Sequence, residues 1–307
     1  MRQMCLNMVY ELAIKDPRIF FVGSDLGVGT LDRFKEEMPR RFLMEGISEA
    51  NVVGLATGLA LEGKIPYVNT IATFITRRCF EQIVVDAALH NVNVRLIGNG
   101  GGLVYAPLGP THLAIEDLAI MRAIPNMTIV APADAEEMRR FMPSTVDHQG
   151  PIYIRLAKGY DPIVTNDDTA FQIGKSIPMR QGSDALIITT GITLKIGLEA
   201  AEILKNQGIS AGVLHNHTIK PLDVNGILEH AADVQAVVSV EEHTIIGGLG
   251  TAVAEVIAES GFNPAKRFKR IGLPDVFPDE YGSQDSLMDR YSITATSLAC
   301  AIKELVD

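Results

Sequence analysis

Short apolar runs alternate along the chain with longer segments in which apolar residues recur at helical spacing. Runs that are apolar almost throughout are typical of strands buried on both faces of a sheet. Most of the segments between them, of about 10–15 residues, repeat with a period near 3.6 and predict helices. The alternation therefore predicts βαβ units with parallel sheets. The strand-like runs are IFFVG (19–23), IPYVNT (65–70), VRLIG (94–98), MTIVAP (127–132), IYIRLA (152–157), ALIITTG (185–191), AGVLHN (211–216) and AVVSVEE (236–242).

The alternation is interrupted once, between residues 161 and 182. This stretch is polar and rich in turn-forming residues, which is typical of a linker that crosses the surface. The pattern thus predicts two consecutive doubly wound α/β domains with mostly parallel sheets, at residues 1–160 and 183–307.

Composition and charge narrow the class of protein. The chain has 307 residues, enough for two domains, and is 47% hydrophobic and 21% charged, as a packed α/β protein should be. A net charge of −10 argues against nucleic acid or an anionic membrane as a partner. No apolar run reaches the roughly 18 residues of a membrane span, and the N-terminus predicts an amphipathic helix without a signal-peptide cleavage pattern. The three cysteines form no CxxC pair, so we expect reduced thiols in a cytoplasmic protein.

One acidic residue stands at the start of a strongly apolar helical segment. The stretch GISEANVVGLATGLAL (46–61) places Glu49 just after Ser48, a plausible N-cap, and just before apolar residues at helical spacing. Taken locally, an acid in the first turn of a helix simply complements the helix dipole. Only the rest of the chain can give Glu49 a chemical role.

Two polar clusters in the second half are predicted to be structural. His215 and His217 flank Asn216, but no third ligand follows at metal-site spacing, so a polar strand end is favoured over a metal site. The pair Glu241 and Glu242 predicts a solvated turn.

Several segments together carry a resemblance to a known family. In this order and spacing they closely resemble the C-terminal half of transketolases, over essentially the whole chain. The resemblance implies a thiamine-diphosphate pyrimidine-binding domain followed by a transketolase C-terminal domain. The segments are GISEANVVGLATGLAL (46–61), TIATFITRRCFEQ (70–82), APLGPTHLAIEDLAIMRAIPNMTIVAPAD (106–134), VLHNHTIKPLD (213–223) and VSVEEHTIIGGLGTAVAE (238–255).

The resemblance implies a cofactor site. Glu49 would bond the ring nitrogen of the aminopyrimidine and favour its imino tautomer, an interaction that is strong where water is excluded. Phe74 matches the aromatic residue that stacks on this ring. Arg78 matches an arginine recurrent in split transketolases and deoxyxylulose-phosphate synthases, and Asp25 matches an acid beside the cofactor.

The resemblance also implies substrate contacts. His112, in GPTH, matches a histidine near the reacting carbon, where imidazole can bind substrate and transfer protons near neutral pH. Arg2 and Arg155 match arginines that bind the phosphate of the acceptor, for which guanidinium groups are well suited.

The sequence departs from transketolases around the substrate. Gly100 stands where they carry a second histidine, Leu108 where they carry an acid, and Gly29 near their phosphate-binding serine. Each missing polar partner costs about 1–3 kcal/mol with the usual sugar. The changes predict a modified sugar and a less polar channel, with Tyr105 filling the vacated space.

A second departure predicts a partner. The chain has no Gly-Asp-Gly motif followed by Asn, which holds Mg²⁺ and the diphosphate in this family. A highly charged diphosphate needs the metal. The resemblance therefore implies an N-terminal transketolase-section subunit that carries this motif and most of the Mg²⁺ contacts, in an α₂β₂ assembly.

The leading hypothesis is a transketolase-like transferase subunit that moves a two-carbon ketol unit from a ketose-type donor to an aldehyde or ketone. A decarboxylating enzyme that uses a 2-oxo donor is the alternative within this chemistry. It would be related to deoxyxylulose-phosphate synthase or to a 2-oxo-acid dehydrogenase β-subunit. A non-catalytic scaffold subunit is the alternative from another class.

Overall fold

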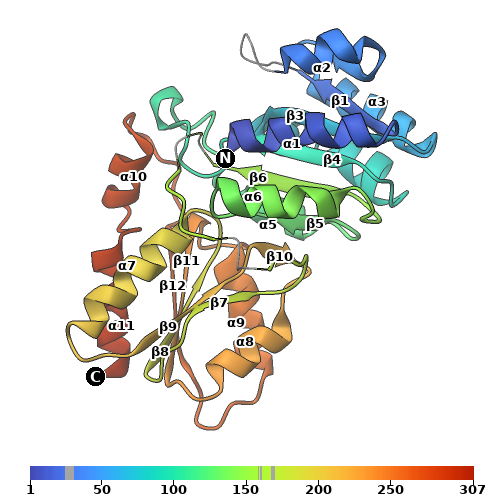
Figure 1. The fold of residues 1–307 in the computed structure, drawn as a ribbon. Coiled ribbons are helices and arrows are strands. Elements are labelled where there is room, and N and C mark those ends of the chain that lie inside the picture. The colour runs from blue at the N-terminus through green and yellow to red at the C-terminus, as the bar shows by residue number, and fades with distance from the viewer. Residues whose placement is uncertain (25–30, 158, 160, 167–169) are drawn as a thin grey trace.

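The computed structural model describes residues 1–24, 31–157, 159, 161–166 and 170–307. These residues form two α/β domains stacked one above the other (Figure 1), with the N-terminus near their junction and the C-terminus at the far end of the second domain. The strands are β1 (Ile19–Gly23), β2 (Phe42–Met44), β3 (Ile65–Ile71), β4 (Arg95–Asn99), β5 (Thr128–Val130), β6 (Ile152–Leu156), β7 (Ile177–Arg180), β8 (Ala185–Thr189), β9 (Ala211–His215), β10 (Thr218–Lys220), β11 (Ala236–Thr244) and β12 (Arg267–Leu273). The helices are α1 (Arg2–Lys15), α2 (Asp32–Glu37), α3 (Glu49–Leu61), α4 (Phe80–Gln82), α5 (Asp117–Arg122), α6 (Ala135–Phe141), α7 (Thr193–Lys205), α8 (Val224–Ala231), α9 (Leu249–Glu259), α10 (Gln284–Arg290) and α11 (Ala295–Val306).

The first sheet has seven strands in the order β10-β5-β6-β4-β3-β1-β2. All neighbours are parallel except β10 and β5, which are antiparallel. The central strands are mostly apolar, as expected where helices cover both faces, and every residue of β4 and β6 is buried. One face packs on α1 and α6 and the other on α3 and α5.

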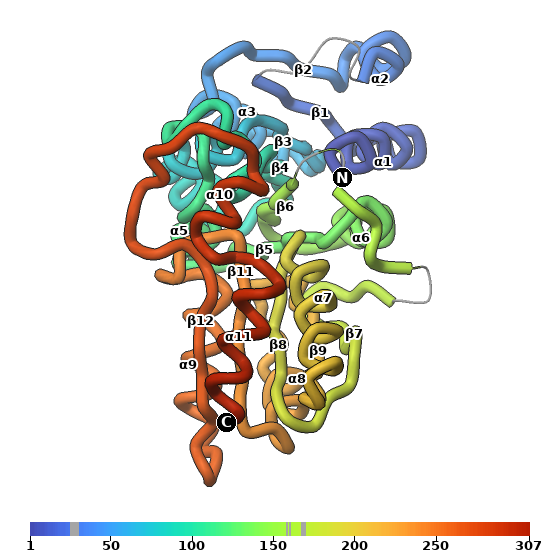
Figure 2. Tube along the Cα trace, turned by 90° about the vertical axis from the view of Figure 1, so that its left-hand side faces the viewer, coloured from blue at the N-terminus to red at the C-terminus, as the bar shows by residue number. Residues whose placement is uncertain are grey.

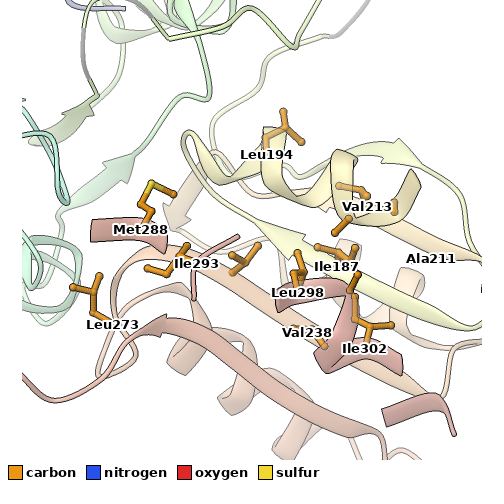
Figure 3. Packing of buried hydrophobic residues seen from close by; sticks show 14 of the residues in the cluster. Ile187, Leu194, Ala211, Val213, Val238, Leu273, Met288, Ile293, Leu298 and Ile302 are labelled. Carbon is orange, nitrogen blue, oxygen red and sulfur yellow. The ribbon is translucent and has the colours of Figure 1, made fainter. Parts of the chain in front are cut away.

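The second sheet has the order β12-β11-β8-β9-β7, parallel except for the pair β7 and β9. Helices α7 and α11 cover one face, where Ile187, Val238 and Leu298 pack together (Figure 3). Helices α8 and α9 cover the other face.

Two α/β domains with mostly parallel sheets confirm the predicted fold class. Two details differ from the sequence-based expectation. Strand β7 lies within residues 161–182, predicted as a linker, and forms an antiparallel edge of the second sheet. Strand β10 follows β9 after two residues but joins the first sheet, so the two domains share this segment. Both are short edge strands, which leave little periodicity in a sequence.

The domains also share a hydrophobic core. Leu103, Ala106, Leu113 and Ile115, from the loops that follow β4, belong to the same buried cluster as the core of the second domain. Among the described residues, no helix has both the length and the apolar character needed to cross a bilayer.

Candidate active site

The candidate site lies at the carboxyl edge of the first sheet and begins with Glu49. This residue is the first of α3, and its exposed fraction is only 3%. Ser48 occupies the N-cap, as predicted, but its hydroxyl donates to the carbonyl of Glu45 at 3.0 Å and does not cap the helix. Glu49 is therefore a carboxylate at a helix start that is turned into the protein, not a surface acid that only complements the helix dipole.

Arg78 and Phe74 lie directly beside this carboxylate. Arg78 Nη1 donates to Glu49 Oε2 at 2.6 Å, and the guanidinium carbon lies 4.6 Å from the centre of the Phe74 ring. Both residues belong to a π-helical segment, Phe74–Arg78, a form that occurs frequently at functional sites. The described residues give the other oxygen, Glu49 Oε1, no hydrogen bond. A buried carboxylate with a free oxygen beside an aromatic ring suits a flat heterocycle with a basic nitrogen.

His112 extends the cluster toward the substrate side. Its ring meets that of Phe74 edge to face, with centroids 5.2 Å apart, and its Nδ1 lies 2.9 Å from the hydroxyl of Thr111. The ring of Tyr105 lies 6.5 Å away on another side of His112. Burial raises the pKa of the Tyr105 hydroxyl, and the nearby guanidinium of Arg2 opposes this rise. Pairwise contacts thus connect the predicted site residues Glu49, Arg78, Phe74 and His112 in one row. Tyr105 continues the row from His112 to Arg2.

A run of three glycines forms the turn beneath Tyr105. Gly100 and Gly102 have positive φ angles of 73° and 65°, which disfavour any side chain. A Cβ at Gly100 would collide with the Tyr105 ring, one at Gly101 with Arg155, and one at Gly102 with Glu242. Tyr105 therefore occupies the space above Gly100, as the sequence suggested.

Arg155 has a different position from the one that its predicted role requires. It is buried, with an exposed fraction of 6%, and its Nε donates to Asp117 Oδ2 at 2.8 Å. Its Nη2 donates to the carbonyls of Ala114 and Glu242, so the guanidinium ties the two domains together. We correct the predicted phosphate contact of Arg155 to a structural role, because Nε and Nη2 both donate to buried protein groups. Asp25, predicted at the cofactor, and Gly29 lie outside the described residues.

The predicted solvated turn at Glu241 and Glu242 is wrong, since both side chains are buried. Glu241 accepts hydrogen bonds from the backbone of Leu249 and Gly250 at the start of α9. Glu242 Oε1 accepts from the Leu103 N–H at 2.7 Å and from Gln284 Nε2 at 2.8 Å. The available signal was the position of both acids at the end of an apolar run that packs into a core.

His215 and His217 are also buried, so the predicted polar strand end lies at the domain junction and not in solvent. His215 Nε2 lies 3.1 Å from Glu137 Oε2 in the first domain. His217 stacks on Phe171 with ring centres 3.9 Å apart, and burial lowers its pKa to about 4. Among the residues that the structure places, no group of three His, Cys, Asp or Glu side chains could hold a metal ion.

Two asparagines that sequence reasoning missed lie at the same sheet edge. Asn69 and Asn99 sit at the carboxyl ends of β3 and β4, and Asn99 Nδ2 donates to Asn69 Oδ1 at 2.8 Å. Asn69 Nδ2 and Asn99 Oδ1 are buried and have no partner among the described residues. Buried polar atoms without partners are rare and suggest a group that the chain itself does not supply. Polar residues at the ends of apolar strands were the available signal.

A cavity of about 580 Å³ lies elsewhere, between α5, β10 and α9, and is lined in part by Arg122, Lys220 and Glu255. It contains none of the predicted site residues. The cluster around Glu49, and not this cavity, is therefore the candidate active site.

The buried carboxyl of Glu242 should make the free energy of unfolding depend on pH. Burial raises the pKa of its carboxyl from 4.5 to about 7, Arg155 and the hydrogen bonds from Gln284 and Leu103 oppose the rise, and Asp117 adds to it. Between pH 4.5 and 7 the folded chain keeps a proton that the unfolded chain releases. Its free energy of unfolding should therefore fall as the pH rises through this window, by on the order of 3 kcal/mol. Urea unfolding at pH 5 and pH 7.5 checks this against Glu242→Gln, which should lack that part of the decrease.

The fold and this cluster define a two-domain α/β protein with a buried carboxylate and an aromatic ring at the carboxyl edge of the first sheet. Residues 1–160 match the family described as "Transketolase, pyrimidine binding domain", and residues 174–298 match "Transketolase, C-terminal domain". The chain therefore belongs to the transketolase family, whose members use thiamine diphosphate.

Its relatives include separate subunits of transketolases. The chain is 37% identical to the 6-deoxy-6-sulfo-D-fructose transketolase subunit of Clostridium sp. (strain MSTE9), over 100% of this chain and 94% of that protein. It is 38% identical to an apulose-4-phosphate transketolase subunit of Phocaeicola vulgatus, over 89% and 87% of the two chains. A solved structure described as a split gene transketolase, inactive beta4 tetramer, superposes with a TM-score of 0.90 at 35% identity, covering 99% of this chain and 97% of the other.

Proposed function

We propose that this chain is the pyrimidine-side subunit of a split transketolase that acts on a modified sugar. The observation that carries the proposal is the buried Glu49 carboxylate, which Arg78 connects to the Phe74 ring and whose Oε1 accepts no hydrogen bond from the residues that the structure describes. Glu49 and Phe74 would hold the aminopyrimidine of thiamine diphosphate, Arg78 would close one side, and Asn69 and Asn99 would offer polar atoms.

In this proposal Glu49 acts on the cofactor and His112 acts on the substrate. When bound, thiamine diphosphate supplies the nucleophilic carbon that accepts and transfers the ketol unit. Glu49 holds a proton at the ring nitrogen, in a position that excludes water. His112 binds the substrate and moves protons at the reacting oxygen, because its ring lies against Phe74 and its Nδ1 against the Thr111 hydroxyl.

The substrate side favours a sugar with an anionic end. Arg2 is exposed and lies next to the Tyr105 hydroxyl, so its guanidinium is available for a phosphate or a sulfonate. Gly100 and Leu108 remove two polar groups from the channel, and Leu108 is 49% exposed. The two relatives are named for 6-deoxy-6-sulfo-D-fructose and for apulose 4-phosphate, which supports a modified sugar here as well.

A partner subunit completes the site in this proposal. It would carry the Gly-Asp-Gly…Asn motif, hold Mg²⁺ and the diphosphate, and form an α₂β₂ assembly in the cytoplasm. Exposed apolar side chains before α3, at its end and after the segment Ile83–Ala88 that packs on it suit a protein contact. Their exposed fractions are 80% for Ile47, 61% for Leu61 and 71% for Leu89. Gly54 and Gly58 on α3 add a flat surface, since a Cβ at either would meet no neighbour.

Reconstitution tests this function. The chain is mixed with an N-terminal transketolase-section subunit, thiamine diphosphate and Mg²⁺. Fructose 6-phosphate and 6-deoxy-6-sulfo-D-fructose serve as donors that differ only at carbon 6, with an aldose phosphate as acceptor. We expect donor cleavage and ketose formation only with both subunits. Release of CO₂ from a 2-oxo acid donor would favour the decarboxylating alternative. Absence of turnover with every donor would favour a non-catalytic scaffold subunit. Tight binding of thiamine diphosphate by the chain alone would refute the assignment of a partner subunit.

A further inference from the structure

We propose that Glu242, which belongs to the C-terminal domain, is a positioning residue that fixes the active-site segment 100–112 in its working geometry. The proposal rests on the proposed function, in which this segment provides Tyr105 and His112 to the substrate side. It assigns the second domain a part in the active site of its own subunit.

The first observation is how segment 100–112 is anchored. Its apolar residues Leu103 and Ala106 are fully buried and belong to the core cluster of the second domain, which also contains Val240 and Leu273. Tyr105, between them in sequence, turns the other way, toward His112. One side of the segment is thus part of the C-terminal core, and the other side forms the wall of the site.

The second observation is the polar contact at the centre of this anchor. Glu242 Oε1 accepts a hydrogen bond from the Leu103 N–H at 2.7 Å. Gln284, the first residue of α10, donates to the same oxygen through Nε2 at 2.8 Å. Gly102 has a positive φ angle, and a Cβ there would collide with the Glu242 carboxylate, so the segment fits closely around this side chain. The chain before α10 also rises alongside the first domain (Figure 2), where the Tyr281 ring lies against Gly109.

The third observation is that Glu242 makes two contacts with the first domain, one through its backbone and one through its side chain. Its backbone carbonyl accepts from Arg155 Nη2, while its side chain reaches Leu103. Without the carboxylate, the buried Leu103 N–H would lose its partner, and such a donor is costly to leave unpaired. The segment would then shift to recover a hydrogen bond, and Tyr105 and His112 would shift with it.

Hydrogen exchange on the full-length chain tests the inference without any need for activity. In Glu242→Ala we expect amide exchange in residues 100–112 to quicken at least tenfold, while strand β8 exchanges as in the wild type. Glu242→Asp keeps the carboxyl group but shortens the side chain, so it should show the same change and covers the case in which the alanine variant fails to fold. Glu242→Gln keeps an oxygen acceptor of equal length and should restore slow exchange.

The assembled enzyme gives the second readout. We expect Glu242→Ala and Glu242→Asp to lower kcat by about 10- to 100-fold with a smaller change in the KM for the donor, because misplaced reacting groups cost more than binding contacts. Val237→Ala, a buried change on the opposite face of the same sheet, controls for a general loss of stability and should leave kcat and the exchange of residues 100–112 unchanged.

Wild-type exchange in residues 100–112 in both the alanine and aspartate variants would overturn the proposal, as would an equal effect of Val237→Ala. An inactive wild-type assembly would instead contradict the proposed function, and the exchange data would still decide whether Glu242 fixes the segment.

Discussion

Replacing Glu49 by glutamine should lower kcat of the assembled enzyme about 100- to 10,000-fold, the range in which a positioned proton donor or acceptor contributes. The carboxamide has the shape of the carboxylate and can still accept from Arg78 Nη1. It cannot hold and return a proton at a ring nitrogen. Because Arg78 is half exposed, its charge stays solvated when Glu49 becomes neutral, so the folded structure should persist, with a thermal unfolding midpoint close to that of the wild type.

Glu45→Gln is the matched control for this change. Glu45 lies four positions before Glu49 and is exposed, so the same chemical replacement there should leave kcat unchanged. Turnover and circular dichroism are measured for both variants in the same assembly. Turnover near the wild-type rate in Glu49→Gln would remove Glu49 from the catalytic role that is proposed for it.

The cluster around Glu49 shows why much of the site could be predicted. Glu49, Phe74 and His112 each lie in a segment that resembles a transketolase motif, and each follows a parallel strand of the same sheet. The carboxyl ends of parallel strands meet at one edge, so residues far apart in sequence come together there. The order of the parallel strands therefore accounts for the closeness of these three residues.

The junction between the domains shows why the rest could not be predicted. Glu242 and His215 end strands of the second domain, and their partners Leu103 and Glu137 are in the first domain. Hydrophobic periodicity describes which face of one strand is buried, and contains no information on which polar group of another domain meets it. The same limit applies to Arg155, whose motif fits a phosphate contact although a buried aspartate holds its guanidinium.

The largest effect on stability should come from breaking the buried pair of Arg155 and Asp117. Both side chains are almost completely buried, and the Tyr153 hydroxyl also donates to Asp117 Oδ2 at 2.8 Å. In Arg155→Met the carboxylate loses its charged partner but stays out of water, so the free energy of unfolding should fall by about 3–5 kcal/mol, measured by urea unfolding of the full-length chain.

Two further variants separate this buried pair from an ordinary ion pair. Arg77→Met breaks the neighbouring, partly exposed contact with Glu116 and should cost no more than about 1 kcal/mol. Combining Arg155→Met with Asp117→Leu removes both charges, so it should recover part of the stability that Arg155→Met loses, because an unpaired buried charge costs more than the absence of the pair. Equal losses in Arg77→Met and Arg155→Met would show that Arg155 is not the electrostatic link between the domains. In that case the shared apolar core around Leu103 and the edge strand β10 would have to hold the two domains together without it.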